Sequence, residues 1–435
     1  MGKEEGGGRD VWTRKRAAAH IYIKEGKRIM KIEFAHRMKQ AAASEIRETL
    51  KLIADKEMIS FAGGNPDPAT FPVDVMGQLI QAILKRDGGM ALQYSPTEGY
   101  DPLRQKIAER LVTYGINAAY EDLLITSGSQ QALSLTGDVF LNDGDVVVCE
   151  NPTYFGAMNA FRKYRPRIVG IGSGPDGEGM DLEELGRTLK KERVKCIYVI
   201  PDYQNPTGNS WPAEKRRELA ELSASYEVPV VEDNPYYEIY YDEKKKKPTI
   251  KHFDKAGNVI FLGSYSKTFC PGLRIGFINA APDILNKYVI MKQGADLQTN
   301  TLGQRLLNEF LETVDFEEHV KRTRELYRSR RDLMAAMLAE HFPEQCKYMV
   351  PDGGFFIWVE LPQGIDGKEL LARAIKNKVA FISGQSFYTD CGRADTIRLS
   401  YSTMPEERIR EGMKRLGAVL NEMDSQPRCD GCARQ

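Results

Sequence analysis

The chain has 435 residues, 42% of them hydrophobic, so it is long enough to bury the cores of two or three domains. Its 61 basic and 61 acidic residues balance to a net charge of zero, which excludes a general attraction to nucleic acid or to an anionic membrane. No apolar run approaches the roughly 20 residues that a membrane-spanning helix needs.

The seven cysteines and five histidines indicate neither a disulfide framework nor a metal site. The cysteines are odd in number and mostly scattered, which is typical of reduced core thiols and favours a cytoplasmic protein. The histidines lack the spacing of metal ligands, and Cys429-x-x-Cys432 has no second pair. We therefore expect no bound metal.

The two ends of the chain differ in composition from the rest. Residues 1–29 contain Gly6-Gly7-Gly8 and eight Lys or Arg against four Asp or Glu, without the apolar core of a secretory signal, so we expect a disordered basic leader. Residues 424–435 are polar and interrupted by Gly and Pro, so we expect a disordered tail.

The pattern between these ends predicts an α/β protein with two domains. In residues 61–315, strand-like apolar runs alternate with helical stretches, which is typical of a mostly parallel sheet flanked by helices on both faces. Residues 316–423 begin with a long helical pattern and continue with strand-like runs between helices. Together with residues 30–60, they should form a smaller, discontinuous α+β domain.

The first two informative strand-like runs end in groups that suit a phosphorylated aromatic ligand. Leu123–Thr126 leads into a turn of small residues that opens a helix at Ser129 and Gln130. A helix start offers N–H groups and a positive dipole end to phosphate. Val146–Cys149 leads to Tyr154, whose ring either stacks on a cofactor or packs in the core.

The next two runs end in an amide and a carboxylate. Ile197–Ile200 leads to Asn205 in an Asn-Pro-Thr-Gly turn, which alone is a turn signal but can also direct an amide donor to a phenolate oxygen. Val228–Glu232 leads to Asp233, with Tyr236 three residues on. A carboxylate there either caps a helix or pairs with a protonated pyridine nitrogen.

The most informative stretch follows a fifth run, Val259–Leu262. Ser264, Ser266 and Lys267 come directly after it, and Arg274 follows seven residues after the lysine. An amine can condense with an aldehyde, while hydroxyls and a guanidinium can hold a phosphate dianion. An aldehyde that carries a phosphate is pyridoxal 5′-phosphate. Taken alone, this motif also fits a solvated turn.

The five strand ends support one another. Because ligands of an open α/β sheet gather outside the carboxyl ends of its strands, one coherent set of groups at five such ends predicts a single site.

Four further motifs complete the pattern, and with them the sequence resembles the class I/II aminotransferases of the superfamily that includes aspartate aminotransferase. They are Ser44-Glu45-Ile46-Arg47-Glu48, Phe61-Ala62-Gly63-Gly64, Gln93-Tyr94-Ser95-Pro96-Thr97-Glu98-Gly99-Tyr100 and Gln293-Gly294-Ala295-Asp296-Leu297. The likeness covers about residues 43–422 and is greatest to the branch of 2-aminoadipate (LysN-like) and kynurenine aminotransferases. It implies the aspartate aminotransferase-like fold, with an active site between two domains near a dimer interface.

In this site each group has an expected role. Lys267 would hold the cofactor covalently and then act as the base that moves a proton. Asp233 would keep the ring nitrogen protonated, Asn205 and Tyr236 would donate to the ring oxygen, and Tyr154 would stack on the ring. The phosphate would be bound by Ser129, Gln130, Ser264, Ser266 and Arg274.

Four residues are expected to bind substrate. Arg398 ends a strand-like alternation and would fork onto the α-carboxylate with Asn205, although an exposed strand arginine is the alternative. Gly64 would let the backbone pass close to the substrate. By resemblance, Arg47 lies near the substrate side chain, where it can pair a distal carboxylate.

The expected function is the transfer of an amino group between an L-amino acid and a 2-oxo acid by a ping-pong mechanism, with broad specificity that includes 2-aminoadipate and glutamate-type substrates. The alternatives are aromatic or branched-chain substrates, or a pyridoxal-phosphate lyase, since the cofactor supplies the same chemistry to all of them. An effector sensor behind a DNA-binding domain would need a winged helix, for which residues 1–29 are too short and glycine-rich. By resemblance, Tyr94 reaches the phosphate of the neighbouring subunit, so we expect a homodimer with shared sites and no nucleic-acid or membrane partner.

Overall fold

The chain divides into two compact units, Met1–Ala42 and Ala43–Gln435. The computed structural model describes residues 22–24, 27–29, 33–39, 57–390 and 392–425. In the first unit, β1 (Tyr22–Lys24) pairs antiparallel with β2 (Lys27–Ile29), and a 3-10 helix, η1, covers His36–Lys39. This strand pair lies in the segment for which composition predicts disorder.

A seven-stranded sheet forms the centre of the second unit, with the order β4-β10-β9-β8-β7-β5-β6. β10 runs antiparallel to both of its neighbours, whereas the other adjacent pairs are parallel. The strands are β4 (Leu123–Thr126), β5 (Val146–Glu150), β6 (Arg167–Ile171), β7 (Val194–Val199), β8 (Val230–Asp233), β9 (Val259–Ser264) and β10 (Gly276–Asn279). The sheet is therefore mostly parallel, as the sequence predicts.

The central strands are almost continuously apolar because helices cover both faces of the sheet. On β7, Cys196 and Tyr198 pack into one core, while Ile197 and Val199 alternate into the other. The first core is shared with α4 (Ser129–Phe140), α5 (Phe155–Arg162) and α9 (Pro282–Ala295). The opposite face is covered by α6 (Leu182–Lys191), α7 (Ala213–Tyr226), α8 (Ile250–Phe253), α2 (Val73–Asp87), α3 (Asp101–Leu111) and α10 (Thr301–Thr313).

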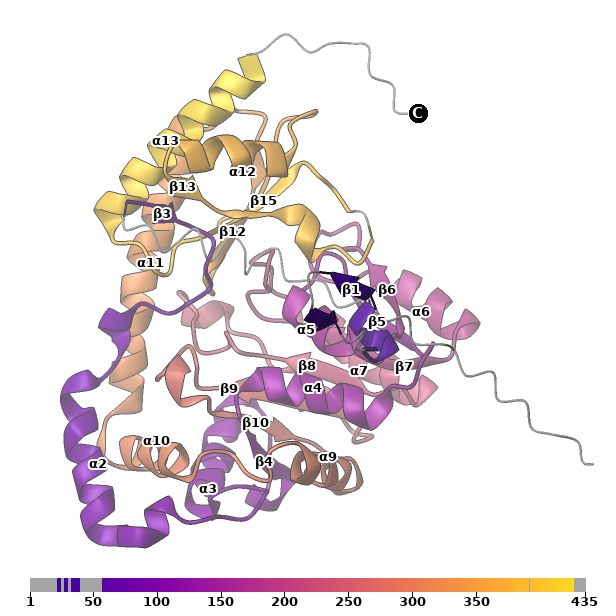
Figure 1. Cartoon of the computed structure of the whole chain (residues 1–435), viewed down its shortest axis with the longest axis vertical. Helices are drawn as coiled ribbons and strands as arrows, with labels where there is room; N and C mark the ends of the chain where they lie inside the picture. The colour runs from indigo at the N-terminus through magenta and orange to yellow at the C-terminus, as the bar shows by residue number, and fades with distance from the viewer. Residues whose placement is uncertain (1–21, 25–26, 30–32, 40–56, 391, 426–435) are drawn as a thin grey trace, which may run out of the picture. The chain divides into compact units, whose positions relative to one another are not determined.

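A long helix, α11 (Phe316–His341), joins the large sheet to a second, smaller layer (Figure 1). Its first residues pack in the core under the large sheet, and its later residues pack in the core of the smaller layer. That layer is an antiparallel sheet of order β11-β12-β15-β14, covered by α12 and α13. The bounds are β11 (Lys347–Tyr348), β12 (Phe356–Glu360), α12 (Gly367–Lys376), β14 (Ile382–Ser383), β15 (Thr396–Ser400) and α13 (Glu406–Ser425).

The segment just before the large domain pairs with the C-terminal layer. β3 (Ile59–Ser60) lies parallel to β13 (Val379–Ala380), and Phe61 continues this pairing by donating its N–H to the Ala380 carbonyl at 2.7 Å. The remaining short elements are the 3-10 helices η2 (Pro68–Thr70), η3 (Gly88–Leu92), η4 (Val112–Tyr114), η5 (Tyr120–Asp122), η6 (Glu243–Lys245), η7 (Pro271–Leu273) and η8 (Gly384–Phe387). None of the helices in the described residues is both long and apolar enough to cross a membrane.

Strand direction decides where the functional groups meet. Because β4, β5, β7, β8 and β9 all run the same way, their carboxyl ends lie along one edge of the sheet. The loops that follow these five strands carry the chemistry predicted from the sequence.

Candidate active site

One cavity of about 290 Å³ collects nearly all of the predicted site residues. It lies at the carboxyl ends of the large-sheet strands and is closed on its other side by residues that follow β3 and by β15 of the smaller sheet. The predicted residues that line it are Gly64, Ser129, Gln130, Tyr154, Asn205, Asp233, Tyr236, Ser264, Ser266, Lys267, Arg274 and Arg398.

Lys267 lines the cavity and is three residues beyond the end of β9. Its Nζ donates to the carbonyl oxygen of Gly64 at 2.8 Å. Burial, together with the positive charges of Arg274 and Arg398, lowers the pKa of Lys267 from 10.5 to about 8. A substantial fraction of the amine is therefore neutral, and nucleophilic, near pH 8.

Asp233 ends β8 and is buried. Its Oδ2 accepts a hydrogen bond from the Tyr198 hydroxyl at 2.8 Å, whereas Oδ1 has no hydrogen-bond partner in the described part of the chain. Burial raises the pKa of Asp233 to about 6, because the charged form loses its hydration. The carboxylate is thus suited to pair with a cation in the cavity.

An anion-binding corner lies where α4 begins. The helix starts at Ser129, after Gly128 with a φ of 76°, and its first N–H groups point out of the helix end. A Cβ on Gly128 would lie 2.3 Å from Nη2 of Arg274, so only glycine admits the guanidinium here. Arg274 also reaches Ser266 Oγ through Nη1 at 3.4 Å. Two hydroxyls, a guanidinium and a helix N-terminus therefore face one corner of the cavity.

The Gln130 side chain forms its hydrogen bonds with Gly156 and Tyr154. Its Nε2 donates to the Gly156 carbonyl at 3.0 Å, and its Oε1 accepts from the Tyr154 hydroxyl at 3.4 Å. What Gln130 offers to an anion is therefore its backbone N–H at the start of α4. Tyr154 itself lines the cavity instead of lying wholly in the core, and a Cβ on Gly156 would lie 2.3 Å from its Cζ, so the glycine makes room for the ring.

Arg398 is buried, so it is not the exposed strand arginine of the alternative interpretation. Its Nη1 donates to Asn205 Oδ1 at 2.7 Å, and its Nη2 donates to the Ala62 carbonyl at 2.6 Å. The guanidinium carbon lies 4.1 Å from the ring centre of Phe356 and 4.9 Å from that of Phe387, and burial lowers the pKa of Arg398 to about 10. The guanidinium stays charged at neutral pH, and its fixed position would allow it to bind a carboxylate.

Close packing requires a glycine at position 64, in the cavity wall. A Cβ on Gly64 would lie 2.6 Å from Cζ of Phe356, while the Gly64 carbonyl faces Lys267. A side chain at this position would push the backbone away from the lysine.

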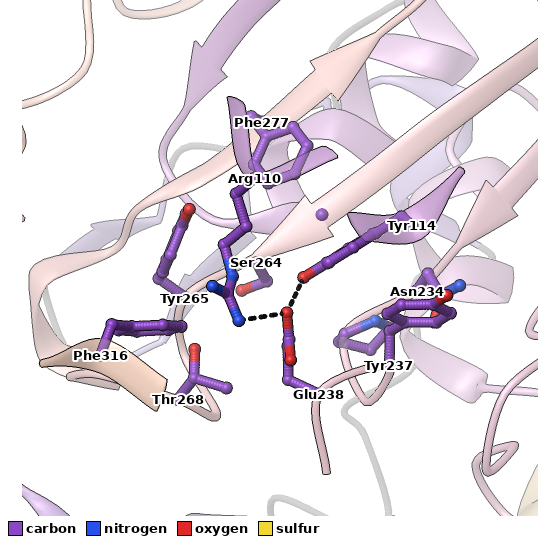
Figure 2. A pocket seen from close by; sticks show the side chains of 12 residues that line it. Arg110, Tyr114, Asn234, Tyr237, Glu238, Ser264, Tyr265, Thr268, Phe277 and Phe316 are labelled. Carbon is purple, nitrogen blue, oxygen red and sulfur yellow. Dashed lines mark hydrogen bonds and ion pairs between the residues drawn. The ribbon is translucent and has the colours of Figure 1, made fainter. Parts of the chain in front are cut away.

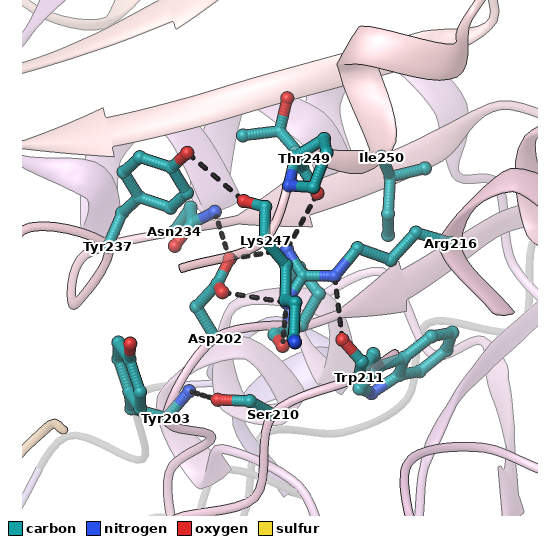
Figure 3. A network of polar contacts seen from close by, with 12 residues as sticks. Asp202, Tyr203, Ser210, Trp211, Arg216, Asn234, Tyr237, Lys247, Thr249 and Ile250 are labelled. Carbon is teal, nitrogen blue, oxygen red and sulfur yellow. Dashed lines mark hydrogen bonds and ion pairs between the residues drawn. The ribbon is translucent and has the colours of Figure 1, made fainter. Parts of the chain in front are cut away.

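A buried polar network underlies the loop that carries Asn205 (Figure 3). Arg216 on α7 is fully buried, forms a two-point ion pair with Asp202 at 2.7 and 2.9 Å, and donates to the backbone carbonyls of Pro201 and Trp211. Asn234, which follows Asp233, donates to the same carboxylate at 2.8 Å. The network therefore ties the loop after β7 to the loop after β8.

A second cavity, lined in part by Ser264, is much smaller than the first (Figure 2). Its volume is about 20 Å³, which is room for about one water molecule. Glu238 in its wall accepts from Arg110 at 2.7 Å and from the Tyr114 hydroxyl at 2.6 Å. Burial alone would raise the pKa of Glu238, but Arg110 and its other cationic neighbours hold it below the ordinary value. The charges are satisfied within the chain, so we interpret this cavity as structural.

Two predicted residues are not brought into the cavity. Tyr94 is 77% exposed and lies away from the cavity of its own chain. Arg47 lies outside the described residues.

Sequence reasoning did not single out Tyr198, Phe356 or the Ala62 carbonyl. Tyr198 had a signal, because it is a polar group within the otherwise apolar run Ile197–Ile200 and shares a sheet face with Asp233. Phe356 and the Ala62 carbonyl carried no such signal. In the sequence, a functional phenylalanine cannot be told from one in the core, and every residue has a backbone carbonyl.

Comparisons with known proteins agree with this site. The family Aminotransferase class I and II matches residues 56–416. Aromatic-amino-acid aminotransferase 1 of Thermococcus litoralis is 43% identical over 384 residues, which are 87% of this chain and 92% of that protein.

Two solved structures are similarly close. The kynurenine aminotransferase of Pyrococcus horikoshii, in complex with PMP, has a TM-score of 0.85 and 41% identity, covering 90% of this chain and 97% of that one. LysN, the α-aminoadipate aminotransferase of Thermus thermophilus, complexed with N-(5′-phosphopyridoxyl)-L-leucine, has a TM-score of 0.84 and 41% identity, covering 90% and 98%.

The chain therefore belongs to the class I and II aminotransferases and has the aspartate aminotransferase-like fold. It is a pyridoxal 5′-phosphate-dependent aminotransferase, which confirms the family, fold and cofactor predicted from the sequence. The described residues fit this cofactor, because Asp233 Oδ1 still lacks a hydrogen-bond partner and the corner at Gly128 suits a phosphate.

Proposed function

We propose that this protein exchanges amino groups between L-amino acids and 2-oxo acids, using the residues of the 290 Å³ cavity as its catalytic and binding groups. The observation that carries the proposal is the meeting of three groups in that cavity. They are the weakly basic amine of Lys267, the partly unpaired carboxylate of Asp233 and the buried guanidinium of Arg398. Pyridoxal 5′-phosphate, when bound, supplies an electrophilic carbonyl and a ring that withdraws electrons from the substrate carbon.

Lys267 is the proposed attachment point and base. With a pKa of about 8, its amine can both react as a nucleophile and accept a proton near physiological pH. Its contact with the Gly64 carbonyl shows that the side chain reaches the part of the cavity wall that follows β3. A lysine with this reach can carry a proton between two carbon atoms held within the cavity.

The groups that face the ring are proposed to be Asp233, Asn205 and Tyr236. Asp233 Oδ1 would accept from the ring nitrogen. Asn205 uses its Oδ1 for Arg398, which leaves its amide N–H₂ as a donor. Burial raises the pKa of Tyr236, so its hydroxyl stays protonated and can also donate. The two donors suit a ring oxygen that carries negative charge.

The phosphate is proposed to bind at the start of α4. There, Ser129 and Gln130 contribute N–H groups, while Ser264, Ser266 and Arg274 contribute hydroxyls and charge. Charge-assisted hydrogen bonds of this kind are typically worth about 1.5–3 kcal/mol each, so the phosphate end should dominate cofactor affinity.

We propose that the site is shared between two copies of the chain. Met90, Leu92 and Tyr94 are 63%, 68% and 77% exposed and Leu297 is 48% exposed, and large apolar side chains with such exposure are of the kind that a partner covers. Thr301 Oγ1 donates to the Gln93 carbonyl at 3.2 Å, which holds this segment against α10. In a dimer that covers these side chains, Tyr94 would extend into the partner's anion corner.

Long-chain amino acids with a distal carboxylate, such as 2-aminoadipate and glutamate, are the proposed preferred substrates, with aromatic and branched-chain amino acids as the second candidate. Both choices have support in the related enzymes, whose names include 2-aminoadipate and aromatic-amino-acid aminotransferases. Arg398 would bind the α-carboxylate common to all of them.

The test is a single-turnover reaction of the purified protein with 2-aminoadipate, glutamate, phenylalanine and leucine in turn. The expected result is one equivalent of 2-oxo acid per active site, together with conversion of the bound cofactor to its amine form. Lys267→Ala should abolish this conversion, because alanine provides neither attachment nor base. A product other than the 2-oxo acid would favour the lyase alternative, and unchanged turnover in Lys267→Ala would refute the assignment of the lysine.

A further inference from the structure

We propose that Tyr198 is a positioning residue, which holds one oxygen of the Asp233 carboxylate so that the other faces the cofactor ring nitrogen. This inference rests on the role proposed for Asp233 above. Tyr198 itself does not line the cavity.

The sheet places these two side chains on the same face. Tyr198 on β7 is paired with Val231 on β8, and Asp233 is two residues farther along β8. Because side chains alternate along a strand, Val231 and Asp233 point to the same side as Tyr198. A diagonal neighbour on an adjacent strand is within reach of a long aromatic side chain. The hydroxyl accordingly donates to Asp233 Oδ2 at 2.8 Å.

Both groups are buried, and the tyrosine ring is closely packed. Tyr198 is 0% exposed and Asp233 is 2% exposed. The ring of Tyr198 packs edge-on to Phe161, with 5.9 Å between centroids and 79° between planes. Since the ring lies in the core between the sheet and α5, its hydroxyl cannot swing away from the carboxylate.

The hydroxyl is also the sole anchor of the carboxylate. Within the described residues, no other side chain or N–H donates to the Asp233 carboxyl group, and Oδ1 is left unpartnered. Two constraints, the strand backbone and Tyr198, therefore fix the carboxylate plane and direct Oδ1. Without the hydroxyl, the carboxylate would lose its orientation and its one favourable interaction with the chain.

The same hydrogen bond favours the ionised form of Asp233. Burial raises the pKa of this carboxyl, and donation from Tyr198 opposes that rise. The other ionisable groups around the cavity are Lys267 after β9, Arg274 after η7, Arg398 on β15, and the Tyr154 and Tyr236 hydroxyls. Removing the Tyr198 hydroxyl should shift the protonation of Asp233 to higher pH.

The experiment compares two holoenzymes, Tyr198→Phe and Tyr288→Phe. Tyr288 is a matched control, because it is also 0% exposed and lies in the same core, where its hydroxyl bonds Thr136 Oγ1 at 2.8 Å. Each variant loses one buried hydroxyl hydrogen bond, and the decrease in melting temperature should be larger for Tyr198→Phe, because its partner is a carboxylate and that of Tyr288 is a neutral hydroxyl.

Two readouts other than activity separate the variants. The first is the dissociation constant for pyridoxal 5′-phosphate, measured by titrating the cofactor-free protein. Tyr198→Phe should raise it about tenfold, which corresponds to about 1.4 kcal/mol, while Tyr288→Phe should leave it unchanged. The second is the pH at which the cofactor absorption of the holoenzyme changes, and the low-pH transition should move to higher pH in Tyr198→Phe alone.

A third variant distinguishes the failure of this inference from the failure of the proposed function. Asp233→Ala should weaken cofactor binding, and adding Tyr198→Phe to it should have no further effect, because the anchored group is gone. If Asp233→Ala weakens binding but Tyr198→Phe behaves as Tyr288→Phe does, the positioning role is refuted and that of Asp233 stands. If Asp233→Ala binds cofactor as the wild type does, both are refuted.

Discussion

Arg398 donates to Asn205 across the junction of the two sheets, at 2.7 Å between Nη1 and Oδ1. Arg398 belongs to β15 of the smaller sheet, whereas Asn205 lies on the loop after β7 of the large sheet. A second contact, from Lys267 Nζ to the Gly64 carbonyl, spans the same junction at 2.8 Å. The substrate end of the cavity is thus assembled by two layers that are far apart in the sequence.

Removal of this guanidinium should weaken every amino-acid substrate. We expect Arg398→Ala to lower kcat/KM by about tenfold to a hundredfold for 2-aminoadipate, leucine and phenylalanine alike, because each presents an α-carboxylate. Arg398→Lys is the control, since it keeps the charge but loses the two-point fork, and its loss should be smaller. Steady-state kinetics on the three substrates tests this, and a loss confined to one substrate would contradict the role.

Arg47 is predicted from the sequence to act on acidic side chains. We expect Arg47→Ala to lower the ratio of kcat/KM for 2-aminoadipate over leucine by roughly tenfold to a hundredfold, because a hydrogen bond to a charged group is worth about 1.5–3 kcal/mol. The measurement is this ratio in the wild type and in the variant. An unchanged ratio would mean that Arg47 does not act on the substrate side chain, and it would leave the amino donor open.

The charged form of Lys267 should destabilise the cofactor-free protein. Its pKa is about 8 in the fold, against 10.5 ordinarily, so the unfolded chain binds more protons between these values and stability rises with pH across that window. Below pH 8 the cost is fully present and amounts to at most about 3 kcal/mol. Lys267→Met should therefore raise the melting temperature at pH 7, and the gain should shrink as pH approaches 10.

Lys292 provides the control for this effect. Lys292 is fully buried, pairs with Asp296 at 2.7 Å and donates to Gln131 Oε1 at 2.9 Å. Lys292→Met should lower the melting temperature, because it removes the hydrogen bonds that the ammonium makes to Asp296 and to Gln131. A lower melting temperature for both variants at pH 7 would show that the Lys267 charge carries no such cost.

A shared site predicts complementation between two inactive variants. In a mixed dimer of Lys267→Ala and Tyr94→Ala, one site combines an intact Lys267 with an intact Tyr94 from the other copy. Random remixing gives about half mixed dimers with one complete site each, so activity should return to about a quarter of the wild-type value. The assay compares remixed subunits with the unmixed parents. Activity no greater than the parents' average would mean that Tyr94 does not act across an interface.

Much of the site could be predicted from the sequence, because parallel topology makes strand ends converge. Asn205, Asp233 and Lys267 each follow an apolar run, and strands that run the same way bring such positions to one edge. The conclusion required no knowledge of the strand order. Local chemistry was also readable, since the Gly128–Ser129 turn opens a helix whose N-terminus suits phosphate.

Other features depended on packing that no local pattern encodes. The antiparallel direction of β10 is set by its pairing with β4 and β9. The sequence predicts Gln130 at the phosphate without saying which of its groups binds, and the structure shows that its side chain bonds Gly156 and Tyr154, because α5 begins beside α4.

By itself, then, the sequence determined the family, the cofactor and the edge of the sheet at which chemistry occurs, since these depend on residue types at strand ends. Only the tertiary structure showed that Arg398 is buried and paired with Asn205, and that Tyr198 donates to one oxygen of Asp233 while the other has no hydrogen-bond partner among the described residues. The physical reason is that burial and pairing across strands or sheets depend on which segments pack together. The residue types that follow a strand, in contrast, are given by the sequence and do not depend on that packing.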